Sequence, residues 1–323
     1  MAQQHSFLTQ HLGIEHPIIC GAMYPCSNPE LVAAVSEAGG VGVVQPISLT
    51  FVHKHQFREG LRYIRTLTQK PIGLNLLIEK SSKKYLEKNK EWLGIALEEG
   101  VKFFITALGN PDWVVRRVEG SGALVFHDTT DKIWAKKAVD AGVHGLICVN
   151  NRAGGHAGQI SPEKLYNDLA PLGIPLVCAG GVGDADSYRA ALKLGYQGVQ
   201  LGTRFIASTE CSAHSDYKQA IVNAEAADII LTRKLTGVPV AVINTKFMRE
   251  RGSEVGGVAK FLLDNPRTKH FARMFYSVRS LFELKQSLNK GAAYKEYFQA
   301  GKSVAGIDRV ESVASIIQGL VSR

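Results

Sequence analysis

One phrase recurs through the first two-thirds of the chain: an apolar helical stretch ends on glycine, and a short run of Val, Ile or Leu follows at once. A helix that closes on glycine and turns directly into a buried strand is the connection of a repeated β/α unit. The repeat therefore predicts a fold built around a parallel sheet. The four copies are EAGGVGVV at 37–44, EEGVKFFI at 98–105, DAGVHGLI at 140–147 and KLGYQGVQL at 193–201.

Eight short apolar runs fit the strands of this repeat. Each is apolar on both faces, as strands buried between two layers must be. Eight such units within about 200 residues predict an α/β fold, a (β/α)8 TIM barrel, with an open doubly wound sheet as the alternative. The runs lie at 17–23, 41–45, 71–78, 101–108, 123–127, 145–150, 175–179 and 198–202.

The pattern changes after Phe205, where helical stretches surround a single β-like segment, TGVPVAVINT. These helical stretches lie at 215–227, 256–263 and 267–288, and a further amphipathic stretch lies at 304–321. We therefore expect three parts: a barrel of residues 1–208, a smaller and mostly helical lobe of residues 209–290 at the barrel mouth, and a helical tail of residues 291–323 that packs back on the barrel.

Composition argues against several classes of protein. Five cysteines without a CxxC pair favour a reducing compartment over a disulfide framework or a zinc site. The N-terminus lacks a signal-peptide pattern and no stretch approaches about 18 consecutive apolar residues, so we expect a cytoplasmic protein without a membrane span. The net charge of +9 is compatible with an anionic small ligand. The lysines that cluster at 80–90 lack interleaved aromatic residues at binding spacing, so no nucleic-acid partner is expected.

The chemistry of such barrels lies at the carboxyl ends of the strands. Here those ends lack lysine, which disfavours a Schiff-base enzyme, and they lack a pair of acids beyond Asp128 and Asp184, which disfavours a glycosidase. Neither an HxH nor an HExxH motif at these strand ends supplies a metal set, so no metal site is expected. The same ends are rich in Gly and Asn, a composition that suits a large bound cofactor.

Two glycine-bearing turns follow the last two expected strands. Gly180 and Gly181 lie in AGGVGD, and Gly202 and Thr203 lie in LGTR. Glycine lets backbone N–H groups approach a phosphate closely, and a Thr hydroxyl can add a donor. Either turn alone is also compatible with a simple βα connection. Because phosphate sites in these barrels often follow strands seven and eight, the two turns together predict one here.

The segment NNRAGGHAG at 150–158 follows the sixth expected strand. Its glycines, Gly155 among them, allow a tight path that presents His156 toward the mouth between small residues. We therefore expect His156 to contact substrate or to act in catalysis. His127 is a second histidine at a strand end, where an inner-layer structural role is equally compatible. Four further histidines are expected on the surface: His5, His53, His144 and His270.

Several motifs together resemble the nitronate monooxygenase family, also called the 2-nitropropane dioxygenase-like flavoproteins. They are GAM (21–23), AAVSEAGGVGVV (33–44), GLNL (73–76), AGGHAG (153–158), AGGVGDADSYRAALKLGYQGVQLGTRF (179–205) and TGVPV (236–240). The resemblance covers most of the expected barrel in the same order, and it implies FMN in a (β/α)8 barrel with a smaller helical lobe. Bacterial flavin-dependent enoyl-thioester reductases and NADH:quinone reductases share these motifs.

The resemblance also implies roles for individual residues. Ala22 and Met23 would present backbone to the isoalloxazine ring, and Asn75 would hydrogen-bond the flavin. His156, beside Gly155, would be the active-site histidine. The glycine turns would hold the FMN phosphate through Gly180, Gly181, Gly202 and Thr203. The sequence departs from the pattern at Asp128, where some relatives carry a basic residue near the flavin.

The expected activity is FMN-dependent oxidation of an alkyl nitronate by O2 to a carbonyl compound and nitrite. His156 would position the anion, or remove the α-proton of a neutral nitroalkane. The alternative is an NAD(P)H-dependent flavin reductase of quinones or enoyl thioesters. A third hypothesis is a phosphate-binding barrel without redox function, but the sequence lacks the strand-end Glu that is typical of isomerases.

A homo-oligomer is compatible with the apolar segment 238–243. Cys26 and Cys211 are expected to be the least buried cysteines, and Cys26 is either a reactive thiol or a passive loop residue.

Overall fold

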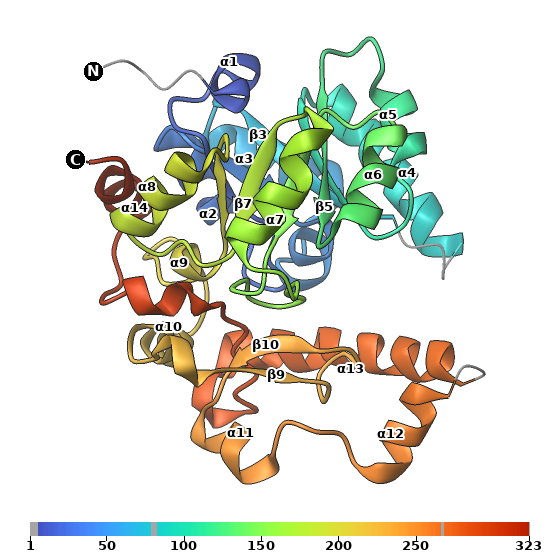
Figure 1. Ribbon diagram of the computed structural model, residues 1–323, viewed down its shortest axis with the longest axis vertical. Coiled ribbons are helices and arrows are strands. Elements are labelled where there is room, and N and C mark those ends of the chain that lie inside the picture. The colour runs from blue at the N-terminus through green and yellow to red at the C-terminus, as the bar shows by residue number, and fades with distance from the viewer. Residues whose placement is uncertain (1–5, 79–82, 266–267, 323) are drawn as a thin grey trace.

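The computed structural model describes residues 6–78, 83–265 and 268–322. Eight parallel strands close into a barrel in sequence order, and β8 pairs with β1 to complete it (Figure 1). The strands are β1 (Ile18–Cys20), β2 (Val41–Val44), β3 (Ile72–Leu77), β4 (Phe103–Ala107), β5 (Leu124–Thr129), β6 (Gly145–Val149), β7 (Leu176–Ala179) and β8 (Val199–Leu201). Each overlaps one of the eight apolar runs. The closed topology confirms the (β/α)8 barrel and excludes the open sheet.

Helices follow the strands and surround the barrel (Figure 1). They are α2 (Pro29–Glu37), the π-helical turn η1 (Ser48–Val52), α3 (Phe57–Leu67), α4 (Lys83–Glu98), α5 (Asp112–Val118), α6 (Lys132–Asp140), α7 (Pro162–Leu169), α8 (Ala185–Leu194) and α9 (Thr203–Ile206). Side-chain caps fix where several begin. Asp131 accepts hydrogen bonds from two backbone N–H groups of α6, and Asp184 forms a capping box with Ser187 at α8.

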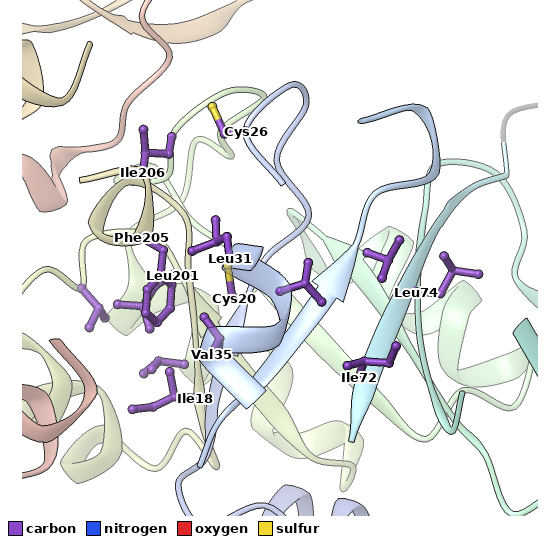
Figure 2. Packing of buried hydrophobic residues seen from close by; sticks show 14 of the residues in the cluster. Ile18, Cys20, Cys26, Leu31, Val35, Ile72, Leu74, Leu201, Phe205 and Ile206 are labelled. Carbon is purple, nitrogen blue, oxygen red and sulfur yellow. The ribbon is translucent and has the colours of Figure 1, made fainter. Parts of the chain in front are cut away.

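Alternation along the strands divides the buried side chains between two layers. One cluster fills the barrel interior and includes Ile19, Phe126 and Ile147. Leu8 of α1 (Phe7–Leu12) joins that interior cluster and closes the amino end of the barrel. The other cluster lies between the strands and the helices. Figure 2 shows part of it, with Leu31 and other side chains of α2 beside β1.

The lobe after α9 combines helices with a small sheet. Strand β9 (Ile229–Thr232) pairs antiparallel with β10 (Val240–Ile243). The helices are α10 (Ser215–Val222), α11 (Lys246–Arg251), α12 (Gly257–Asp264) and α13 (Lys269–Lys290). Arg267, where the last helical stretch was expected to begin, lies outside the described residues. The sequence pattern indicated β10 but not β9, because the apolar run of β9 is only the three residues Ile229 to Leu231.

This lobe lies across the carboxyl ends of the barrel strands. The Tyr24 hydroxyl, in the loop after β1, donates to the carbonyl of Leu281 at 2.5 Å. The ammonium group of Lys285 donates to the carbonyl of Phe51, which follows β2, at 3.1 Å. Gly155, after β6, forms an isolated antiparallel bridge with Ala241. Three different strand-end loops thus hold the lobe over the mouth.

The last described segment returns to the barrel. The 3-10 turn η5 (Lys302–Gly306) precedes α14 (Val313–Val321), which packs against α2 and α8. Buried Arg204 of α9 pairs with Glu311, and its guanidinium also donates to the carbonyl of Arg309 at 2.9 Å. Within the described residues, no helix has both the length and the apolar character needed to cross a membrane.

Candidate active site

The residues singled out from the sequence all lie at the carboxyl end of the barrel. Ala22 and Met23 follow β1, and Asn75 lies on β3. Asp128 lies near the end of β5, and Gly155 and His156 follow β6. The glycine turns follow β7, with Gly180 and Gly181, and β8, with Gly202 and Thr203. The fold therefore gathers these residues around one mouth.

The turn after β7 requires glycine at both of its positions. Gly180 has φ +114°, and a Cβ there would lie 2.5 Å from the Ala153 nitrogen; Gly181 has φ +85°. Asn150 supports the turn, because its Nδ2 donates to the carbonyl of Gly180 at 3.0 Å. The same amide accepts from the backbone N–H of Arg152 through Oδ1 at 2.8 Å. The Asn150 side chain thus joins the loops after β6 and β7, which approach each other closely because Gly180 carries no side chain.

The turn after β8 adjoins the loop after β1. A Cβ on Gly202 would lie 3.2 Å from the sulfur of Met23. Thr203 is buried, and its Oγ1 accepts a hydrogen bond from the backbone N–H of Gly301 at 2.9 Å. A hydroxyl that accepts in this way keeps its own hydrogen to donate.

The sequence analysis missed the contribution of residues 300–306 to these turns. The N–H of Lys302 donates to the carbonyl of Arg152 at 2.8 Å. A Cβ on Gly183 would lie 2.2 Å from the carbonyl oxygen of Ser303. No local motif marks these positions, because their packing depends on chain segments more than a hundred residues away.

His156 stands between the barrel and the lobe. Its Nε2 lies 3.3 Å from the hydroxyl of Thr236, in the loop between β9 and β10. The preceding residue, Gly155, has φ +64° and bridges to the lobe through Ala241. His156 is accessible to solvent, but enough protein surrounds it that desolvation lowers its pKa below the ordinary value. A neutral imidazole in an accessible position can accept a proton from a ligand.

Polar side chains line the upper part of the barrel interior. Asn75 is buried, and its Nδ2 donates to the carbonyl of Ile105 at 3.3 Å. Asp128 follows Phe126 by two residues on β5 and so shares its interior face. Within the described residues, Asp128 Oδ1 and Gln200 Oε1 are buried without a hydrogen-bond partner. Burial raises the pKa of Asp128 to about 7, so a substantial fraction of this carboxyl is protonated near neutral pH.

Gln200 was not singled out from the sequence. A polar residue between Val199 and Leu201 of β8 was the available signal. A Cβ on Gly21 would lie 2.9 Å from the Gln200 side chain, so glycine at position 21 leaves room for that amide. Gln200 and Gly21 therefore form one packed feature of the mouth.

His127 faces away from the barrel interior. Its Nδ1 lies 2.9 Å from the hydroxyl of Thr106 on the neighbouring strand, and the side chain is buried. Burial lowers the pKa of His127 to about 4, which keeps the ring neutral. This placement fits a structural role for His127 rather than a role at the barrel mouth. The side chain lies on the outer face of the strand, however, and not in the inner layer.

The cysteines differ from their expected placement. All five are free and buried, including Cys26 and Cys211, which the sequence suggested to be the least buried. Cys26 and Cys211 lie together, and the Cys211 thiol, together with burial, holds the pKa of the Cys26 thiol well above its usual value. Cys26 is therefore a passive loop residue rather than a reactive thiol. No group of three or more His, Cys, Asp or Glu side chains in the described part of the chain could hold a metal ion.

Comparisons with known proteins point to one family. A family model described as nitronate monooxygenase matches residues 5–323. The chain is 27% identical over 304 residues to a probable nitronate monooxygenase of Staphylococcus aureus, covering 81% of this chain and 84% of that protein. It is 28% identical over 246 residues to the (3aS,4S,5R,7aS)-5-hydroxy-7a-methyl-1-oxo-octahydro-1H-indene-4-carboxyl-CoA dehydrogenase of Rhodococcus jostii, covering 76% of this chain and 67% of that protein.

Solved structures share the whole architecture. FabK from Thermotoga maritima is similar with a TM-score of 0.80 at 29% sequence identity, over 98% of this chain and 95% of that chain. A nitroalkane oxidase from Streptomyces ansochromogenes has a TM-score of 0.77 at 23% identity, over 97% of this chain and 96% of that chain. The second likeness shows the fold alone.

Proposed function

Because the chain belongs to the nitronate monooxygenase family of oxidoreductases, we propose that it is an FMN-dependent enzyme that oxidises alkyl nitronates with O2. The products would be a carbonyl compound and nitrite. The observation that carries the proposal is the placement of His156, accessible and neutral, at the mouth that the glycine turns share. We further propose that residues 1–208 bind the cofactor, that residues 209–290 govern substrate choice, and that residues 291–323 brace the barrel.

The residues at the mouth fit FMN. The close approach at Gly180 and Gly202 leaves backbone where a side chain would otherwise stand, which suits a phosphate. Thr203 has a hydroxyl hydrogen to donate to the same group. The unpartnered oxygens of Asp128 and Gln200 offer the polar contacts that a flavin ring with N–H groups requires. Ala22, Met23, Asn75, Gly155 and Gly181 complete the proposed binding set.

FMN, when bound, supplies the electron transfer between the organic substrate and O2. The protein's own contribution is binding and proton control. Neutral His156 can donate a hydrogen bond to an oxygen of the nitronate, or accept the α-proton of a neutral nitroalkane. Thr236 at 3.3 Å orients the imidazole. Protonated Asp128 can donate a hydrogen bond into the barrel interior, where a basic side chain would instead place a positive charge.

Substituting Gly180 by Ala is expected to weaken FMN binding at least about tenfold, because the new Cβ would clash with the Ala153 nitrogen and force the turn to move. The dissociation constant can be measured by quenching of flavin fluorescence. Gly173→Ala is the matched control: Gly173 has φ +71°, but a Cβ there would meet nothing within 4 Å. Equal affinity in both variants would remove the turn after β7 from the cofactor site.

The activity is tested with purified protein whose chromophore is identified after heat release. Nitrite release from a preformed alkyl nitronate in air, together with released FMN, is the expected result. A colourless protein that fails to take up FMN would overturn the proposal.

A second candidate function is favoured by the carboxyl-CoA name of the Rhodococcus jostii relative: reduction of an enoyl thioester with NAD(P)H as the electron donor. Anaerobic mixing separates the two candidates. Rapid bleaching of the visible absorption by NADH or NADPH would favour the second, and bleaching by nitronate alone would favour the first.

A further inference from the structure

Two lysines converge on one aromatic ring at the rim of the mouth. Lys54 follows η1, in the connection after β2, and Lys285 belongs to α13 of the lobe. Their ammonium groups lie 4.9 Å and 4.6 Å from the centroid of the Phe51 ring. The two ammonium groups also interact with each other. Desolvation is the main cause that lowers the pKa of Lys285, and the positive charge of Lys54 lowers it further. Two like charges are thus held together between barrel and lobe.

Nothing described in the chain neutralises this pair. Among residues 6–78, 83–265 and 268–322, no carboxylate lies within ion-pair distance of Lys54 or Lys285. The carboxylate of Glu30 interacts electrostatically with His53 of this loop. Glu30 is already engaged, since it accepts hydrogen bonds from Tyr63 at 3.0 Å and from Asn28 at 2.8 Å. An unpaired cation pair of this kind offers a site for an anion.

The loop that carries Lys54 has two further unusual features, a left-handed backbone conformation and a half-buried histidine. Lys54 adopts φ +65°, a left-handed conformation uncommon for a residue with a side chain. Its neighbour His53, expected on the surface, is half-buried, and within the described residues its Nε2 has no hydrogen-bond partner. A hydrogen bond to the backbone of Pro25 ties the His53 ring to the loop after β1. His55 adds a third titratable side chain to the same loop, and its ring stacks on Tyr63.

Aromatic side chains continue from this cation pair along α13. The Phe282 ring meets Phe51 edge-on with centroids 5.3 Å apart. Phe271, Phe275 and Phe282 recur at helical spacing on one face of α13, and all three are exposed. Cations beside exposed aromatic rings suit a ligand that joins a phosphate to a planar base.

We propose that Lys54 and Lys285 form a subsite for the ribose phosphate of an adenine nucleotide ligand. The shared chemistry is a phosphomonoester on an adenosine ribose, supplied either by a coenzyme A thioester or by NADPH. The loop between β2 and α3 places the subsite beside the mouth, because the Ser48 hydroxyl contacts the carbonyl of Met23 at 3.5 Å. This subsite rests on the proposed function in one respect: the reactive end of the nucleotide ligand would enter the same barrel mouth.

The test is a calorimetric titration of the purified protein with four probes: coenzyme A, 3′-dephospho-coenzyme A, NADPH and NADH. The expected result is that at least one phosphorylated probe binds about tenfold more tightly than its partner lacking the phosphate, the size of one charge-assisted hydrogen bond. The preference should disappear in the double variant Lys54→Gln, Lys285→Gln. It should persist in Lys54→Arg and Lys285→Arg, which keep the charge.

The matched control is Lys246→Gln, an exposed lysine of the same lobe, which should leave the preference intact. A preference for coenzyme A alone identifies a thioester carrier, and a preference for NADPH alone identifies a dinucleotide. Equal binding within both probe pairs, no binding at all, or a preference that survives the double glutamine variant would overturn the assignment. Nitrite release by the unsubstituted protein is scored separately, so the loss of one proposal is distinguishable from the loss of the other.

Discussion

Replacing His156 by Asn is expected to lower kcat/KM for a neutral nitroalkane by roughly 10²–10⁴, the usual contribution of a positioned general base. Asparagine can still donate a hydrogen bond to a nitronate oxygen but cannot accept the α-proton. Turnover of a preformed nitronate should therefore fall less than turnover of the nitroalkane. Steady-state kinetics with both substrate forms measure the difference. Unchanged turnover of both forms would remove His156 from the mechanism.

The pH profile provides an independent check on this role. Desolvation lowers the pKa of His156, so the imidazole remains neutral and able to accept a proton below its ordinary titration range. Nitroalkane turnover should persist as the pH falls past about 6.5 and decline only below that point. His11→Asn is the control, because His11 lies in α1 at the opposite end of the barrel, where its ring stacks on Phe7 and its Nδ1 lies 2.8 Å from the Phe7 carbonyl oxygen. Its substitution should leave the pH profile unchanged.

Replacing Arg204 by Met is expected to reduce the free energy of unfolding by about 3–5 kcal/mol, because it leaves a partly buried carboxylate without its buried partner. The Arg204 side chain is 4% exposed, and Glu311 is 24% exposed. The lost guanidinium also removes the hydrogen bond to the carbonyl of Arg309. Urea unfolding followed by circular dichroism measures the change.

Arg309→Met is the matched control for this substitution. Arg309 pairs with the same carboxylate at 3.1 Å, but its side chain is 66% exposed. An exposed pair of this kind contributes about 0–1 kcal/mol, so the control should differ little from the unsubstituted protein. Equal losses in the two variants would show that burial of Arg204 does not set the strength of the interaction.

The barrel could be predicted from the sequence because its signals are local. Each strand is a short run such as the one from Val41 to Val44, and every strand except β3 follows a helix that ends near glycine. The caps at Asp131 and Asp184 are equally local, since each side chain bonds to backbone within three residues. Strand number and order then follow from the connection rules of parallel β/α units.

Contacts between distant segments could not be predicted in this way. Thr236 lies beside His156, and Gly301 beside Thr203, only because the lobe and the tail fold back over the barrel. His53 carries no signal in its own neighbourhood that it would be half-buried and hydrogen-bonded to the loop after β1. Strand β9 was missed because its apolar run, from Ile229 to Leu231, is only three residues long.

The return of the last described segment to the barrel has a consequence for how the protein is made. The ribosome releases β8 roughly a hundred residues before α14, so all eight strands exist while the helix that packs on α2 and α8 is still absent. During that interval Arg204 has no Glu311 to meet, and the turn after β8 lacks the N–H of Gly301. The turn after β8 therefore gains these partners only once the chain has been made through Gly301 and Glu311, and the barrel mouth stays unfinished until then.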